Sequence, residues 1–106
     1  MKKLIEIFKQ NNFTKTKETK KSIEFEHLQT NEIVYLLPNL ELSIVLNPDK
    51  VKGDEKLENK SCGLRHNTSF RQFPKRKNTG KDQIHFGYAY KFQSPEELES
   101  FLKEYI

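Results

Sequence analysis

A ten-residue alternation near the end of the chain, QIHFGYAYKF at 83–92, constrains the fold more than any other segment. Successive side chains of a β-strand point to opposite faces, so the pattern predicts one long strand with a strongly apolar face. That face carries Ile84, Phe86, Tyr88, Tyr90 and Phe92. We expect it to be the sheet side of the core; the alternative is a platform on which bases stack, as on RNA-binding sheets.

The opposite face of the same strand carries two small residues, Gly87 and Ala89, between His85 and Lys91. A glycine inside a strand often marks a point where another group approaches the backbone closely. We therefore expect some group to lie over this part of the sheet.

Helices are predicted at both ends of the chain. Residues 2–11 place several apolar side chains on one helical face. Residues 94–106 show the same spacing and also carry start signals, because Ser94 can act as N-cap, Pro95 suits the first helical position and Glu97 completes a capping box.

Three further strands are predicted in the first half of the chain, at 22–28, 32–37 and 40–47. Their connections are too short for parallel crossovers, so we expect an antiparallel meander. The connector TKTKETKK at 14–21 is interpreted as an exposed loop, with a secondary phosphate contact as the alternative. Residues from about 48 to 83 read as a long polar and basic loop, in which a short helix or hairpin at 64–73 would be no surprise.

These elements predict an α+β fold. A two-layer structure would place the N- and C-terminal helices on one face of a four-stranded, mostly antiparallel sheet, in the order α-β-β-β-loop-β-α. With 106 residues, the chain is expected to be a single domain spanning 1–106. Only 34% of the residues are hydrophobic, so the core should be thin, and a homodimer that shares it is an alternative.

The composition also indicates a compartment. No apolar run approaches the ~20 residues that span a membrane. The single cysteine, Cys62, cannot form an internal disulfide. We therefore expect a cytoplasmic protein without membrane contact.

Positive charge is concentrated in one part of the chain. The net charge is +4, yet residues 60–92 hold eight of the nineteen Lys and Arg residues and one of the fifteen acidic ones. Within this region the stretch LRHNTSFRQFPKRKNTGK, at 64–81, contains no acidic residue. Such a local excess of charge creates a local field that attracts anions.

The leading hypothesis is that this stretch binds nucleic acid, RNA or DNA. Arg and Lys bind phosphate by charge, and aromatic residues can stack on unpaired bases. The expected contacts are Arg65, His66, Arg71, Lys75, Arg76, Lys77 and Lys81, with Phe70 and Phe73 for stacking. Two alternatives remain: an interaction or inhibitor module that docks on an acidic protein, and a solvated loop that packs both Phe residues inward.

A metal-independent nuclease is a further alternative. It would need a general base, a general acid and a cation for the transition-state charge. The candidates are His66, His85, Arg65, Arg71 and Tyr88. Because no spacing among them is diagnostic, catalysis is the weaker hypothesis.

Metal and cofactor sites are not predicted. Cys62 and His66 lie four residues apart, but no second pair of ligands accompanies them. The segment NTGK, at 78–81, ends like a phosphate-binding loop but lacks the earlier glycine and the following Ser or Thr.

Overall fold

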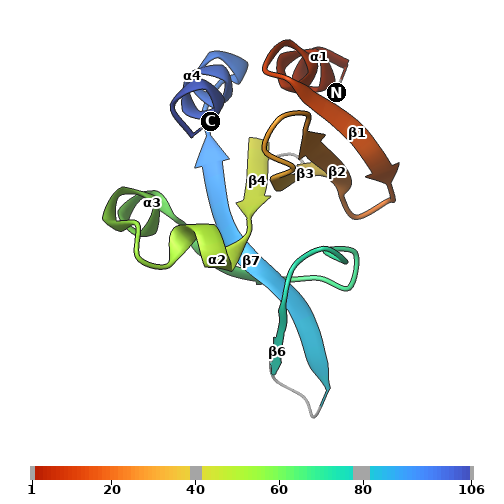
Figure 1. The fold of residues 1–106 in the computed structure, drawn as a ribbon, viewed down its shortest axis with the longest axis vertical. Helices are drawn as coiled ribbons and strands as arrows, with labels where there is room; N and C mark the ends of the chain where they lie inside the picture. The colour runs from red at the N-terminus through yellow and green to blue at the C-terminus, as the bar shows by residue number, and fades with distance from the viewer. Residues whose placement is uncertain (1, 39–41, 78–81, 106) are drawn as a thin grey trace.

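The computed structural model describes residues 2–38, 42–77 and 82–105, which form an α+β fold around an antiparallel sheet (Figure 1). The helices are α1 (Lys2–Gln10), α2 (Pro48–Val51), α3 (Glu55–Lys60) and α4 (Pro95–Tyr105). The strands are β1 (Phe13–Glu18), β2 (Ile23–His27), β3 (Ile33–Pro38), β4 (Leu42–Leu46), β5 (Gly63–His66), β6 (Lys75–Lys77) and β7 (Gln83–Phe92). The sheet order is β1-β2-β3-β4-β7-β5, and β6 pairs separately with β7.

The predicted class and the terminal helices are confirmed. The meander β2-β3-β4 is antiparallel, and β7 lies beside β4 with Ile44 opposite Tyr90. At the start of α4 the Glu97 amide donates to the Ser94 hydroxyl at 3.2 Å, so Ser94 is the N-cap that the sequence predicted.

The predicted count of four strands is wrong, because the described part of the chain contains seven. The additional strands are β1, β5 and β6. Five of the six β1 residues are exposed, and no residue of β5 or β6 is fully buried. These short strands at sheet edges are held by backbone pairing, and therefore leave no apolar alternation in the sequence.

The region predicted as one long loop, about 48–83, also contains two short helices. Asn47 caps α2 by accepting from the Asp49 amide at 2.9 Å, and Asp54 caps α3 by accepting from the Leu57 amide at 3.2 Å. The Tyr90 hydroxyl then donates to the Leu57 carbonyl at 2.7 Å and ties α3 to the sheet. Both helices are too short to show a clear apolar period.

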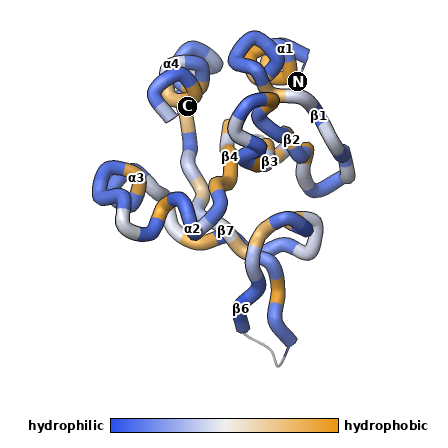
Figure 2. Tube along the Cα trace, in the orientation of Figure 1, coloured by the Kyte–Doolittle hydropathy of each residue, from blue (hydrophilic) through white to orange (hydrophobic). Residues whose placement is uncertain are grey.

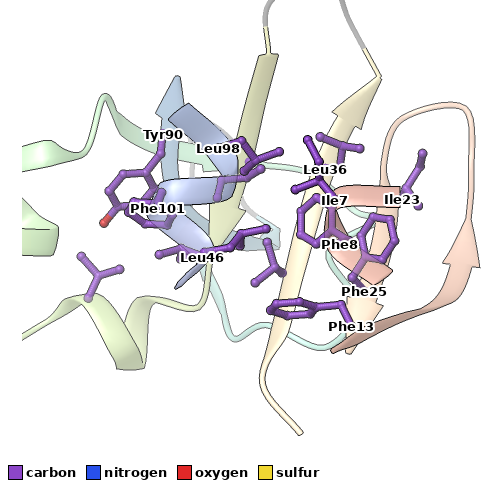
Figure 3. Close-up of a cluster of buried hydrophobic side chains, with 14 residues drawn as sticks. Ile7, Phe8, Phe13, Ile23, Phe25, Leu36, Leu46, Tyr90, Leu98 and Phe101 are labelled. Atoms are coloured by element: carbon purple, nitrogen blue, oxygen red, sulfur yellow. The ribbon is translucent and has the colours of Figure 1, made fainter. Parts of the chain in front are cut away.

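The main core lies between the helices and one face of the sheet (Figure 3). Phe8 of α1 stacks on Phe25 of β2 at 4.1 Å, and Phe101 of α4 packs against Tyr90 of β7 at 5.4 Å between ring centroids. Most of the aromatic row on β7 thus serves as core, as expected. Among the described residues no helix is long and apolar enough to cross a bilayer; the longest, α4, has 11 residues.

The second face of the sheet, away from the helices, has its own smaller cluster of Tyr35, Leu37, Val45, Phe70 and Phe73. The two Phe residues come from the basic stretch that the sequence analysis singled out. Strand β6 and the start of β7 project away from the helices (Figure 1), and β6 is hydrophilic along its length (Figure 2). We call β6 together with residues 83–86 of β7 the arm.

Candidate functional site

Residues 67–74, the crossing segment, carry the chain from one edge of β7 to the other. The Asn67 amide donates to the His85 carbonyl, and the Phe86 amide donates to the Pro74 carbonyl, each at 3.0 Å. Neighbouring residues of a strand direct their backbone polar groups to opposite edges. Asn67, which follows β5, and Pro74, which precedes β6, therefore pair with opposite edges of β7, so β5 and β6 lie on opposite sides of that strand. The crossing segment therefore passes over the second face of the sheet.

Gly87 makes this crossing possible. A Cβ atom at this position would lie 2.5 Å from Val45 Cγ1, 2.6 Å from the Leu46 carbonyl oxygen and 3.0 Å from Phe73 Cδ2. The group predicted to approach the strand at its small residues is thus Phe73 of the chain itself. His85 helps to hold Phe73 in this place, because the His85 Nδ1 atom lies 2.5 Å from the Phe73 carbonyl oxygen.

Phe70 and Phe73 are buried, with 1% and 3% of their surfaces exposed. Their ring centroids lie 4.9 and 4.8 Å from that of Tyr35. Neither ring offers a face to a base in this conformation. Their packing corresponds to the alternative in which the basic loop turns its two Phe residues inward.

Arg71 is held by a carboxylate of the protein. Its Nε and Nη2 atoms donate to the two oxygens of Glu24 at 3.1 and 3.0 Å, and the Glu24 side chain is only 2% exposed. The same carboxylate accepts from the Tyr35 hydroxyl at 2.6 Å and the Thr16 hydroxyl at 2.7 Å. Arg71 therefore attaches the crossing segment to β2.

These contacts decide the protonation state of Glu24. Burial alone would raise the pKa of Glu24, but hydrogen bonds from Arg71, Tyr35 and Thr16 outweigh it and hold this pKa below its usual value. Burial and the bond to Glu24 together raise the pKa of the Tyr35 hydroxyl. At neutral pH the group is thus an ionised carboxylate with a protonated phenol and a guanidinium as donors.

A cleft of about 360 Å³ opens beside the crossing segment. We call it the basic cleft, and it is lined by Lys20, Lys21, Leu37, Pro38, Arg65, His66, Asn67 and Phe70. No described lining residue is acidic. Within the described part of the chain no ion pair involves its two lysines or Arg65. The cleft can therefore attract an anion without an internal competitor.

Arg65 was predicted as a contact, whereas Lys20 and Lys21 were not predicted to belong to the same site. Both lysines lie in the β1–β2 turn, where the only sequence signal was the basic composition of the connector. The two lysines line the same cleft as Arg65 because the crossing segment spans the sheet and its Ser69 hydroxyl lies 2.7 Å from the Ser22 hydroxyl.

The other predicted cations lie on the arm. All three residues of β6 are exposed: Lys75, Arg76 and Lys77. Lys75 and Lys77 pair with His85 and Gln83, so their side chains lie on the face of β7 that the crossing segment covers. Arg76 points to the other face, where its guanidinium carbon lies 5.5 Å from the centre of the Phe86 ring. Lys81 lies outside the described residues.

The two histidines of the nuclease hypothesis lie on opposite faces of the sheet. The His66 ring stacks on Phe86 with 5.8 Å between ring centroids, on the face of β7 opposite to His85, and His66 also lines the basic cleft, whose lining includes neither His85 nor Tyr88. His85 contacts Phe73 on the second face, and Tyr88 packs at the margin of the main core. The structure does not bring these groups together around one substrate.

Other clefts differ from the basic cleft in charge. One of about 490 Å³ lies between α3 and α4 and mixes acidic with basic lining residues. Cys62 is exposed, and the described residues contain no group of three or more His, Cys, Asp or Glu side chains that could hold a metal ion.

No protein-family model matches the chain, and the search of curated proteins found no match.

Proposed function

We propose that this protein binds nucleic acid through the basic cleft and the arm. The observation that carries the proposal is the convergence of Lys20 and Lys21 with Arg65 around a cleft whose described lining has no carboxylate. Cations that are distant in sequence meet at one place, beside a second basic group at Lys75–Lys77. Phosphodiester backbones present the regularly spaced anions that such a surface attracts.

The proposed contacts differ from the set that composition alone suggested. Six cations are assigned to phosphates: Lys20, Lys21, Arg65, Lys75, Arg76 and Lys77. Arg71, Phe70 and Phe73 are instead assigned to holding the crossing segment in place. Because Phe70 and Phe73 are buried, binding should depend on charge more than on stacking or base identity.

The experiment is fluorescence anisotropy with labelled single-stranded RNA, single-stranded DNA and duplex DNA across a salt series. If all six cations bind phosphates, the logarithm of affinity should fall with the logarithm of salt concentration with a slope between about −4 and −5.5. The ligand with the highest affinity identifies the class of nucleic acid.

A matched control separates the proposed surface from total charge. The cleft variant (K20Q/K21Q/R65Q) and the arm variant (K75Q/R76Q/K77Q) should each weaken binding. The control variant (K9Q/K52Q/K103Q) removes the same charge from exposed positions elsewhere and should bind like the wild type. Equal losses in all three variants, with circular dichroism unchanged, would show that the surface has no specific role.

An acidic protein is the competing partner. If no nucleic acid binds at low salt, and a pull-down from nuclease-treated extract recovers an acidic protein that the cleft variant fails to retain, the nucleic-acid proposal is refuted. A nuclease is not proposed, since His66 and His85 lie on opposite faces of the sheet.

A further inference from the structure

We propose that the basic cleft receives a phosphate monoester, the group that ends a phosphorylated nucleic-acid strand, in preference to the diesters within the strand. The inference rests on the proposed function and assigns its two basic regions different roles. The cleft would hold the terminal phosphate, and the arm would contact the backbone that leads away from it.

The size of the cleft is the first argument. Small-molecule sites have volumes of about 300–1,000 Å³, and this cleft, at about 360 Å³, is near the lower limit. A volume of this size fits the single terminal group of a strand better than several successive nucleotides.

Charge is the second argument. A phosphate monoester carries about −1.5 to −2 charges at pH 7, against −1 for a diester. Lys20, Lys21 and Arg65 provide three positive charges, and no described residue of the lining is acidic. The cleft should therefore stabilise the more highly charged group by a larger amount.

Preorganisation is the third argument. The Thr19 hydroxyl accepts from the Lys21 and Ser22 amides, each at 3.1 Å, and the Thr19 amide donates to the Ser22 carbonyl at 2.9 Å. The turn that presents the two lysines is thus closed on itself. The contact between the Ser22 and Ser69 hydroxyls then fixes this turn against the crossing segment. A site formed before binding loses less conformational entropy when the ligand enters.

The remaining walls suit the rest of a nucleotide. Leu37 and Pro38 contribute apolar atoms to the lining, against which a sugar can lie. Asn67 stands at the end of β5, and its Oδ1 accepts from the Ser69 amide at 2.8 Å. Its amide nitrogen donates to no other described residue and can donate to a phosphate oxygen.

The position of the arm indicates where the strand continues. Arg65 lies opposite Gly87, and Lys75 and Lys77 lie opposite His85 and Gln83 on the same face. Gln83 and Gly87 are four residues apart on β7. At about 3.4 Å per residue, Lys77 therefore lies roughly 14 Å along the strand from Arg65. The cations thus extend from the cleft in one direction.

The test compares labelled single-stranded oligonucleotides of about ten nucleotides, within the ~4–16 that single-strand sites cover. They share one sequence and carry a 5′-phosphate, a 3′-phosphate or hydroxyl groups at both ends. One phosphorylated form should bind on the order of tenfold more tightly than the unphosphorylated form, because hydrogen bonds to a charged group are strong. The cleft variant should lose this difference, and the arm variant should keep it while binding every oligonucleotide more weakly.

Each outcome separates this inference from the proposed function. Equal binding of all oligonucleotides by the wild type, or a preference that persists in the cleft variant, overturns the inference and leaves nucleic-acid binding intact. If no oligonucleotide binds but a nucleoside monophosphate does, and the cleft variant does not bind it, the monoester site is supported with a free nucleotide as its ligand, and the proposed function is refuted. Binding of neither refutes both.

Discussion

Glu24 holds the crossing segment against the sheet by accepting four hydrogen bonds from side chains. Replacing it by Gln removes the charge and places an amide where the Arg71, Tyr35 and Thr16 donors converge. We expect Glu24→Gln to reduce the free energy of unfolding by about 1.5–3 kcal/mol, the range for hydrogen bonds to charged groups. Urea unfolding followed by circular dichroism measures the change.

Glu26 offers a matched control on the same strand. It is partly exposed, and its carboxylate accepts no hydrogen bond from a described residue. Glu26→Gln should change stability by less than about 0.5 kcal/mol. Equal effects of the two substitutions would contradict a special role for Glu24.

The lowered pKa of Glu24 predicts a dependence of stability on pH. A carboxyl group with a lower pKa in the folded state stabilises the fold above its unfolded pKa, which is about 4.3. That contribution is lost as pH falls through the folded pKa. The difference in unfolding free energy between wild type and Glu24→Gln should therefore be largest near neutral pH and shrink below about pH 4. A difference that stays constant from pH 7 to pH 3 would show that the carboxylate charge is not the cause.

At the scale of elements, the crossing segment determines how the basic stretch can act. Because Phe70 packs against Tyr35 on the second face, we expect Phe70→Ala to destabilise the protein by about 3–5 kcal/mol, as for other buried Phe residues. A stacking role would give the opposite pattern, with unchanged stability and weaker binding. Thermal unfolding and oligonucleotide titration of the same variant distinguish the two.

Sequence patterns predicted the elements that bury a regular apolar face and missed those held by the backbone. Strand β7 and helix α4 followed from periodicity and from the Ser94 cap. By contrast, β5 and β6 pair with β7 while their side chains remain largely exposed, so hydropathy carried no sign of them. Their place became visible only with the sheet order, which a single sequence does not contain.

The prediction of the candidate site was also limited because a single sequence does not contain the sheet order. Arg65 and the arm cations were predicted as contacts from local composition. Lys20 and Lys21 could not be joined to them, because their proximity depends on a segment that crosses the whole sheet. The inward position of Phe70 and Phe73 likewise depends on Gly87 allowing that segment to pass close to the strand.

At the scale of the whole molecule, the proposed nucleic-acid binding should depend on where the cations gather more than on the net charge of +4. Each phosphate contact contributes about 0.7 to 0.9 to the salt slope of nucleic-acid binding. The cleft variant and the arm variant should therefore each reduce the magnitude of the slope by about 2 to 3. The control variant K9Q/K52Q/K103Q should leave it unchanged. A reduced slope in the control would indicate that binding follows total charge.

Strand β7 belongs to two environments along its length. Residues 88–92 pair with β4 beneath the helices, whereas residues 83–85 pair with the three residues of β6 on the projecting arm (Figure 1). Amide hydrogens of the first group should exchange with solvent only when the whole protein unfolds, and those of the second group through local opening. One continuous strand would then contain both slowly and rapidly exchanging amides, with the change near Phe86. A strand so divided can let its outer end adapt to a partner while its inner end keeps the sheet intact.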